Sequence, residues 1–189
     1  MKNFKELLKE NRIITAVKDL KDLDSALLSD SQIIFLLCGD ICSLEEITRK
    51  VKSSGKMPFV HTDMIAGISG KDIVALDFIK ENSFAEGIIT TKPNIAKYAK
   101  SLGLKVILRC FLLDSLSFEN TKKMVHEQDF DAVEILPGIM PKIIKKLSSQ
   151  IKIPLIAGGL ISDMEDIEVA IESGASAVST TKLNKFKNS

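Results

Sequence analysis

Residues 153–181 read IPLIAGGLISDMEDIEVAIESGASAVSTT, a short apolar run, a segment of helical period and a second short run. Leu155–Ala157 and Ala177–Ser179 have the character of strands that are covered on both faces, as in a parallel sheet. Between them, Ser162 and the glutamate three residues later have the spacing of a capping box, and a glycine follows the last turn. The stretch therefore predicts a strand–helix unit followed by the strand of the next unit.

The same unit recurs along the chain with a period of roughly 23 residues, which suits a barrel of the repeated strand–helix type. Eight such units predict a compact (βα)₈ TIM barrel, with its last helix truncated to residues 182–189. The predicted strands are Ile13–Val17, Ile33–Cys38, Phe59–Thr62, Gly87–Thr90, Val106–Phe111, Ala132–Leu136, Leu155–Ala157 and Ala177–Ser179.

An open, doubly wound sheet is the main alternative fold. It more often has five or six strands and a glycine-rich loop after the first strand. Here the first predicted strand is followed by KDLKDL, without such a loop. No linker or change in composition divides the chain, so we expect one TIM-barrel domain over residues 1–189.

The composition favours a cytoplasmic protein without a membrane anchor. No apolar run reaches the ~20 residues that cross a bilayer, and the start, MKNFKELLKENR, is a charged amphipathic segment rather than a signal peptide. Cys38, Cys42 and Cys110 form no CxxC pair, which argues against a zinc site and suits free thiols in a reducing compartment. The net charge of +1 gives no global field that attracts a polyanion.

The strongest candidate site lies after the last two predicted strands. In such barrels function sits at the carboxyl ends of the strands, and the last two loops commonly bind phosphate. Gly158 and Gly159 leave backbone N–H groups open to an anion, and Ser179 and Thr180 add hydroxyl donors. The alternative is a tight turn that needs glycine for its backbone angles.

Charged residues end three of the other predicted strands or follow them. Lys92 and Arg109 could supply positive charge to the same ligand, and Lys92 could also form a Schiff base if its pocket were desolvated. Arg109 could equally pair with Glu134. Glu134 could accept hydrogen bonds from a polyol or act as a general base.

His61 and Asp63 are two residues apart and share one side of a strand continuation. They could bind a metal, but a third ligand is lacking, so we predict no metal site. An HxD pair that holds a loop through hydrogen bonds is the favoured interpretation.

Six strings of the sequence resemble the glycerol-3-phosphate-responsive antiterminator family, a regulator of bacterial glycerol-uptake operons. The resemblance spans about residues 12–181 and is densest from His61 onward. The strings are HTDMIAGISGKD, GIITTKPNIAKYAKSLGL, RCFLLDS, AVEILPGIMPKIIKK, IPLIAGGLIS and AVSTT.

This resemblance implies a TIM barrel that senses glycerol 3-phosphate and acts on leader mRNA, so that transcription passes a terminator. It implies a regulator without a cofactor rather than an enzyme. In that case Gly158, Gly159, Ser179 and Thr180 would hold the phosphate; Lys92, Arg109 and Glu134 would face the phosphate or the glycerol hydroxyls; His61 and Asp63 would shape the third loop.

RNA binding needs clustered cations, often with aromatic side chains. Lys142, Lys145 and Lys146 share one face of a predicted helix, although an ordinary solvated face is the alternative.

An aldolase or isomerase acting on a sugar or triose phosphate, with Lys92 or Glu134 as the reacting group, is the competing function. A barrel that has lost its regulatory partner is a third. A homo-oligomer is left open.

Overall fold

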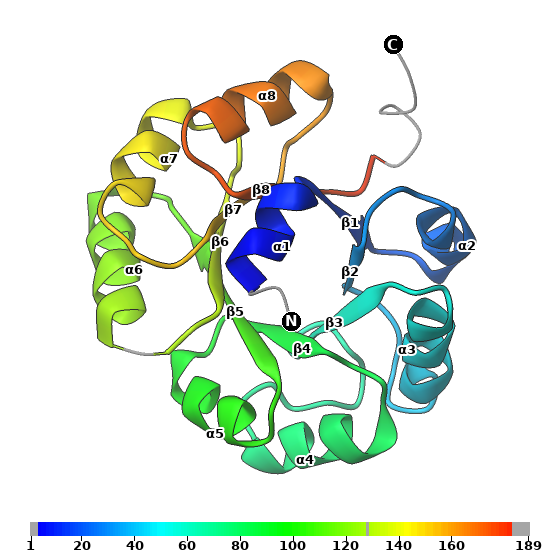
Figure 1. The fold of residues 1–189 in the computed structure, drawn as a ribbon. Helices are drawn as coiled ribbons and strands as arrows, with labels where there is room; N and C mark the ends of the chain where they lie inside the picture. Colours follow the sequence, from blue (N-terminus) through cyan, green and yellow to red (C-terminus); the bar gives the residue numbers. More distant parts are fainter. Residues whose placement is uncertain (1–3, 128, 183–189) are drawn as a thin grey trace.

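Eight parallel strands close into a barrel in sequence order, so that β8 pairs with β1 (Figure 1). This is a computed structural model, and it describes residues 4–127 and 129–182. The eight predicted strands are confirmed, with ends that differ by one or two residues. They are β1 Ile13–Val17, β2 Ile33–Leu36, β3 Met57–His61, β4 Gly87–Thr90, β5 Lys105–Phe111, β6 Ala132–Leu136, β7 Leu155–Gly158 and β8 Ala177–Thr180.

Helices follow each of the first seven strands and form the outer ring. The truncated last helix predicted over residues 182–189 lies, except for residue 182, outside the described residues. The helical segments are α1 Phe4–Glu10, the 3₁₀ turn η1 Leu20–Asp22 with α2 Leu23–Leu27, α3 Leu44–Ser53, α4 Ile73–Asn82, the 3₁₀ turn η2 Pro93–Ile95 with α5 Ala96–Ser101, α6 Ser115–Glu127, α7 Pro141–Ser148 and α8 Met164–Glu172.

The helix after β7 begins one residue later than the sequence pattern predicts. Asp163, not Ser162, is the N-cap of α8, and its carboxylate accepts a hydrogen bond from the backbone N–H of Asp166 at 3.0 Å. Asp166 in turn accepts from the backbone N–H of Ser162 at 2.8 Å. Two aspartates therefore form the reciprocal cap, because their charged oxygens are strong acceptors at a helix N-terminus.

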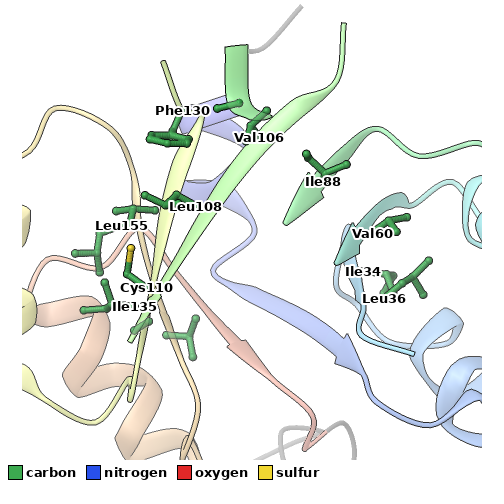
Figure 2. Packing of buried hydrophobic residues seen from close by; sticks show 14 of the residues in the cluster. Ile34, Leu36, Val60, Ile88, Val106, Leu108, Cys110, Phe130, Ile135 and Leu155 are labelled. Carbon is green, nitrogen blue, oxygen red and sulfur yellow. The ribbon is translucent and has the colours of Figure 1, made fainter. Parts of the chain in front are cut away.

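The larger part of the core lies between the strands and the helices. Outward-facing side chains such as Leu36, Val60 and Leu108 are fully buried against the helices (Figure 2). Burial of each such side chain stabilises the fold by roughly 1.5–3 kcal/mol relative to exposure. The continuous hydrophobicity of the strands follows from this outer layer together with a filled interior.

The amino-terminal half of the barrel interior is filled by apolar side chains. Phe35 and Phe59 are fully buried there, with ring centroids 6.0 Å apart. Helix α1 lies across the barrel opening (Figure 1), where Leu8 is fully buried and the Phe4 ring stacks on Phe59 at 5.5 Å. Because this end is closed, a ligand can enter the interior only from the carboxyl ends of the strands.

Gly87, the first residue of β4, lies where the strand passes close to its neighbours. A Cβ there would lie 2.5 Å from the backbone oxygen of Lys105 and 2.6 Å from a ring carbon of Phe59. Since a backbone oxygen in a barrel strand cannot move aside, Gly87→Ala is expected to lower the free energy of unfolding by about 3 kcal/mol in denaturant titrations.

Gly55→Ala is the matched control. This glycine has φ +80°, and a Cβ added to it would have no atom within 4 Å, so only backbone strain of about 1 kcal/mol is expected. Equal losses in the two variants would contradict the close approach at β4.

Candidate functional site

The inward-facing positions of the barrel become polar one layer above the apolar interior. Arg109 of β5, Glu134 of β6 and Ser179 of β8 each lie two residues after a buried apolar residue of the interior cluster. Because side chains of a strand alternate between its faces, these three groups point into the same space. The three polar side chains therefore lie together inside the barrel, toward the carboxyl ends of its strands.

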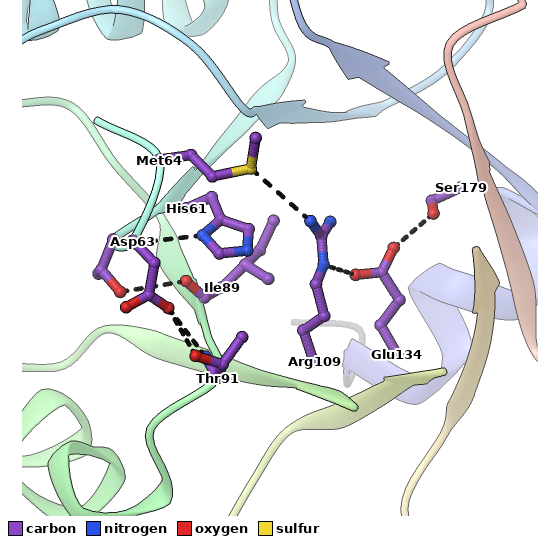
Figure 3. A network of polar contacts seen from close by, with 9 residues as sticks. His61, Asp63, Met64, Ile89, Thr91, Arg109, Glu134 and Ser179 are labelled. Atoms are coloured by element: carbon purple, nitrogen blue, oxygen red, sulfur yellow. Dashed lines mark hydrogen bonds and ion pairs between the residues drawn. The ribbon is translucent and has the colours of Figure 1, made fainter. Parts of the chain in front are cut away.

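Glu134 is at the centre of a buried hydrogen-bond network (Figure 3). Its Oε2 accepts from Arg109 Nε at 2.6 Å, and its Oε1 accepts from the Ser179 hydroxyl at 2.5 Å. The side chains of Arg109 and Glu134 are 8% and 1% exposed. Such burial requires paired charges, and the pairing of Arg109 with Glu134 that the sequence offered as one alternative is present here.

A cavity of about 290 Å³ lies above this network. Its lining combines charged and hydroxyl side chains with apolar ones, which is the character of a small-molecule site. Of the described residues, Lys18 is the only lysine that lines it. The lining residues are Ala16, Lys18, Leu37, Met64, Arg109, Phe111, Glu134, Leu136, Gly159, Leu160, Ile161, Ser179, Thr180 and Thr181.

The loop after β7 is shaped by two left-handed residues and one close approach. Gly159 has φ +77° and Leu160 has φ +62°, a conformation uncommon for a residue other than glycine. Within residues 4–127 and 129–182, their N–H groups make no backbone hydrogen bond. A Cβ on Gly158 would lie 2.5 Å from Ser179 Oγ and 2.6 Å from Glu134 Oε1. Only glycine therefore fits at this position of β7, next to the network.

The two hydroxyls at the end of β8 are hydrogen-bonded within the protein. Ser179 donates to Glu134, as described above. Thr180 Oγ1 donates to the carbonyl oxygen of Ile161 at 3.4 Å and accepts from the backbone N–H of Lys182 at 3.1 Å. Both residues line the cavity, as do their neighbours Gly159 and Thr181.

The side chains of the third and fourth loops bond to one another. Asp63 Oδ2 accepts from the backbone N–H of Thr91 at 3.1 Å and from its hydroxyl at 2.9 Å. The N–H of Asp63 donates to His61 Nδ1 at 3.3 Å, so the His61 Nδ1 acts as an acceptor. The described residues hold no group of three or more His, Cys, Asp or Glu side chains suited to a metal ion.

Lys18 lines the cavity, whereas Lys92, which the sequence suggested as a ligand contact, does not. The ammonium of Lys92 lies 3.1 Å from the Thr91 hydroxyl, and Lys92 does not line the cavity. Lys18 does line it, although sequence reasoning assigned it no ligand. Its position two residues after the inward-facing Ala16 is the signal that could have identified it.

The basic face predicted on α7 has the expected orientation. Lys142, Lys145 and Lys146 are exposed, whereas Ile144 and Leu147 are fully buried. The ammonium of Lys146 lies 4.6 Å from the ring centroid of Phe118 on α6, a cation–π contact. This face lies on the outer ring and is separate from the cavity lining.

Residues 13–184 match the family model described as "Glycerol-3-phosphate responsive antiterminator". The chain belongs to this family. It is 44% identical over 175 residues to the uncharacterized protein YgcP of Escherichia coli (strain K12), covering 93% of this chain and 91% of YgcP. No helix in the described part of this antiterminator-family chain is long and apolar enough to cross a membrane.

Two solved structures with related names have the same fold. The glycerol uptake operon antiterminator regulatory protein of Listeria monocytogenes str. 4b F2365 has a TM-score of 0.88 and 30% identity, over 94% of this chain and 95% of that chain. A glycerol uptake operon antiterminator-related protein of Thermotoga maritima MSB8 has a TM-score of 0.81 and 32% identity, over 93% and 98%. The (βα)₈ barrel is therefore the fold of this family.

His61 is 3% exposed beside the Arg109 guanidinium (Figure 3). Burial, and next the charge of Arg109, lower the pKa of His61 from 6.5 to about 4, although Asp63 opposes the shift. Between those two pH values the unfolded chain binds a proton that the folded protein does not. Acidification from pH 6.5 to 4 should therefore cost up to about 3 kcal/mol of unfolding free energy through this group.

His61→Gln should flatten the dependence of the unfolding free energy on pH within this window, measured by denaturant titration at a series of pH values. His126→Gln, which changes an exposed histidine of α6, should leave the wild-type slope in place. Identical slopes in the wild type and His61→Gln would show that the buried imidazole is not the source.

Proposed function

We propose that the protein is a glycerol-3-phosphate sensor that binds the leader mRNA of a glycerol-utilisation operon and antiterminates its transcription. The observation that carries the ligand half is the cavity above Glu134, which is small and lined by both polar and apolar residues. Membership of the antiterminator family supports the regulatory half.

The phosphate is proposed to lie against the loops after β7 and β8. Gly159 and Leu160 offer backbone N–H groups there, and Gly158 keeps the approach free of a side chain. Lys18 supplies the positive charge, because the charge of Arg109 is already matched by Glu134. The glycerol hydroxyls then point inward, toward the network.

RNA is proposed to contact Lys142, Lys145 and Lys146 on the exposed face of α7. Contacts between lysines and backbone phosphates make affinity fall steeply with salt. For a sensor, glycerol 3-phosphate must change the affinity for RNA, commonly by about 1–3 kcal/mol of coupling free energy. Such a regulator needs no resident cofactor and would act in the cytoplasm, as a monomer or a homo-oligomer.

The competing enzymatic function finds less support in this geometry. A Schiff-base lysine needs a desolvated pocket that carries the substrate. Lys92 does not line the cavity, and Lys18, which does, is exposed. Glu134 as a general base would have to act while held by Arg109 and Ser179. Ligand binding without turnover is therefore the proposed behaviour.

Isothermal titration calorimetry with sn-glycerol 3-phosphate tests the ligand half. The wild type should bind the compound, and Lys18→Ala should weaken binding by about tenfold through loss of a charge-assisted contact to phosphate. Lys21→Ala is the matched control, because Lys21 is an exposed lysine close in sequence that pairs with Asp19 outside the cavity. Equal affinities in wild type and Lys18→Ala would remove Lys18 from the site.

Fluorescence anisotropy with labelled leader RNA tests the regulatory half. Saturating glycerol 3-phosphate should change RNA affinity, and the variant Lys142→Ala/Lys145→Ala/Lys146→Ala should weaken RNA binding and reduce its salt dependence by about three phosphate contacts. A triple alanine variant at Arg49, Lys50 and Lys52 on α3 is the control. RNA affinity that is unchanged by the ligand would defeat the sensing proposal, and unaltered binding by the α7 variant would exclude that surface.

A further inference from the structure

A second cavity, which we call the α6–α7 groove, opens beside the basic face of α7. It lies between the start of α6 and α7, which are neighbouring helices of the outer ring (Figure 1), and its volume is about 310 Å³. The two most buried of its lining side chains are 7% and 5% exposed and form its floor. They are Leu112 and Phe118, and the walls include Leu113, Met140, Ile143 and Lys146.

The walls of the groove leave apolar surface in contact with water. Leu113 is 84% exposed, and Met140 and Ile143 are only half-buried on the α7 side. An exposed apolar patch with a polar rim is characteristic of a binding site, because covering it removes apolar surface from water. The groove is therefore suited to a flat or apolar group of a partner.

Lys146 joins the groove to the basic face of α7. It lines the groove, and its ammonium lies 4.6 Å from the ring centroid of Phe118. A phosphate that draws Lys146 outward uncovers the aromatic face at the floor of the groove. The lost cation–π contact is then replaced by an ion pair with the phosphate and by a ring on which a base can stack.

Two carboxylates at the rim of the groove are engaged by the protein itself. Asp114 accepts a hydrogen bond from the backbone N–H of Ser117 at 2.7 Å, in the first turn of α6, and Glu119 is ion-paired with Lys122 at 2.5 Å. The α6 N-terminus and Lys122 thus offset the two negative charges. A polyanion is attracted to the α7 side of the groove, where the lysines lie.

We propose that the α6–α7 groove binds one unpaired base of the RNA, which stacks on Phe118 while the lysines of α7 contact the adjoining phosphates. This rests on the proposed RNA binding by α7 and adds a pocket to that surface. Proteins recognise RNA chiefly through unpaired bases that stack on aromatic side chains. A nucleotide links base and phosphate covalently, so a strand along α7 brings both to Lys146 and Phe118 together.

The groove and the ligand cavity share two loops. In the loop after β5, Phe111 lines the cavity and Leu112 lines the groove; in the loop after β6, Leu136 lines the cavity and Met140 the groove. The backbone N–H of Leu112 donates to the carbonyl oxygen of Leu136 at 2.9 Å and ties the loops together. A base in the groove and a ligand in the cavity would rest on the same two loops, which is the connection that a sensor needs.

Fluorescence anisotropy with labelled leader RNA and the full chain tests the proposal. Leu113→Asp places a negative charge on the exposed wall and should weaken RNA binding at least about tenfold, because it repels the phosphate next to the base. Leu28→Asp is the matched control. It makes the same change in net charge at a leucine that is 77% exposed, after α2 and at the opposite end of the barrel, and it should keep the wild-type affinity.

A second pair of variants tests the aromatic floor. Phe118→Leu removes the ring but keeps an apolar side chain, and it should weaken RNA binding about tenfold through the loss of stacking. Phe130→Leu changes a phenylalanine that is 2% exposed and precedes β6 (Figure 2), and it should keep the wild-type affinity. Thermal unfolding of each variant verifies its fold.

A scan of single abasic positions along the same RNA identifies the occupant. Removal of the contacted base should cost the wild type about tenfold in affinity and should cost Phe118→Leu almost nothing, because the two changes remove the same contact. If Leu113→Asp binds weakly but no abasic position shows this pattern, the groove takes something other than a base, and the proposal is overturned.

The remaining outcomes separate this inference from the proposed function. Wild-type RNA affinity in Leu113→Asp would overturn the groove as a base site while RNA binding stands, and this variant stays decisive if Phe118→Leu fails to fold. Light scattering that shows a dimer in the wild type and a monomer in Leu113→Asp, with RNA affinity unchanged, would assign the groove to a second copy of the chain. If the wild type binds no leader RNA, the proposed function fails, and this inference fails with it.

Discussion

A carboxylate that is almost fully removed from water must be paired, and the upper half of this barrel is organised around that requirement. Glu134 lies directly opposite Arg109 in the register of β5 and β6, so the two side chains emerge from adjacent strands at the same height. Their ion pair, completed by the Ser179 hydroxyl, satisfies both oxygens of the acid. If one partner were removed, the other would be left as an uncompensated buried charge.

The surrounding residues follow from this pair. Gly158 lacks a side chain where β7 crosses the network, and His61 stays neutral beside the guanidinium because burial and the nearby charge disfavour a second cation. Below the network, Phe35 and Phe59 fill the interior, and α1 closes the opposite end. The cavity can therefore form only between the ion pair and the loops of the last two strands.

Much of this architecture could be predicted from the sequence. The eight strands could be predicted because strands covered on both faces are continuously apolar, and such runs are visible in a short stretch of sequence. Glycines and hydroxyls that are close in sequence predict a phosphate site in the loops after β7 and β8, and Gly159, Ser179 and Thr180 line the cavity there. The bounds of α8 were wrong by one residue, because the choice between Ser162 and Asp163 as the cap depends on local geometry.

Other features depend on which strands become neighbours and on where each hydroxyl proton goes. The sequence left Arg109 divided between a ligand and Glu134, and only strand register decides that they pair. The sequence alone does not distinguish Lys92 from Lys18 as a cavity residue. In the structure, Lys92 bonds to Thr91 outside the cavity, whereas Lys18 lines the cavity. The donation from Ser179 to Glu134 joins two strands that are far apart in the chain.

The most direct measurement is a crystal structure of the protein grown with sn-glycerol 3-phosphate. We expect electron density in the cavity above Glu134, with the phosphate against Gly159, Leu160 and Lys18 and the hydroxyls directed to the carboxylate. A ligand bound elsewhere, or a phosphate resting on Glu134 and Ser179, would contradict the proposed site.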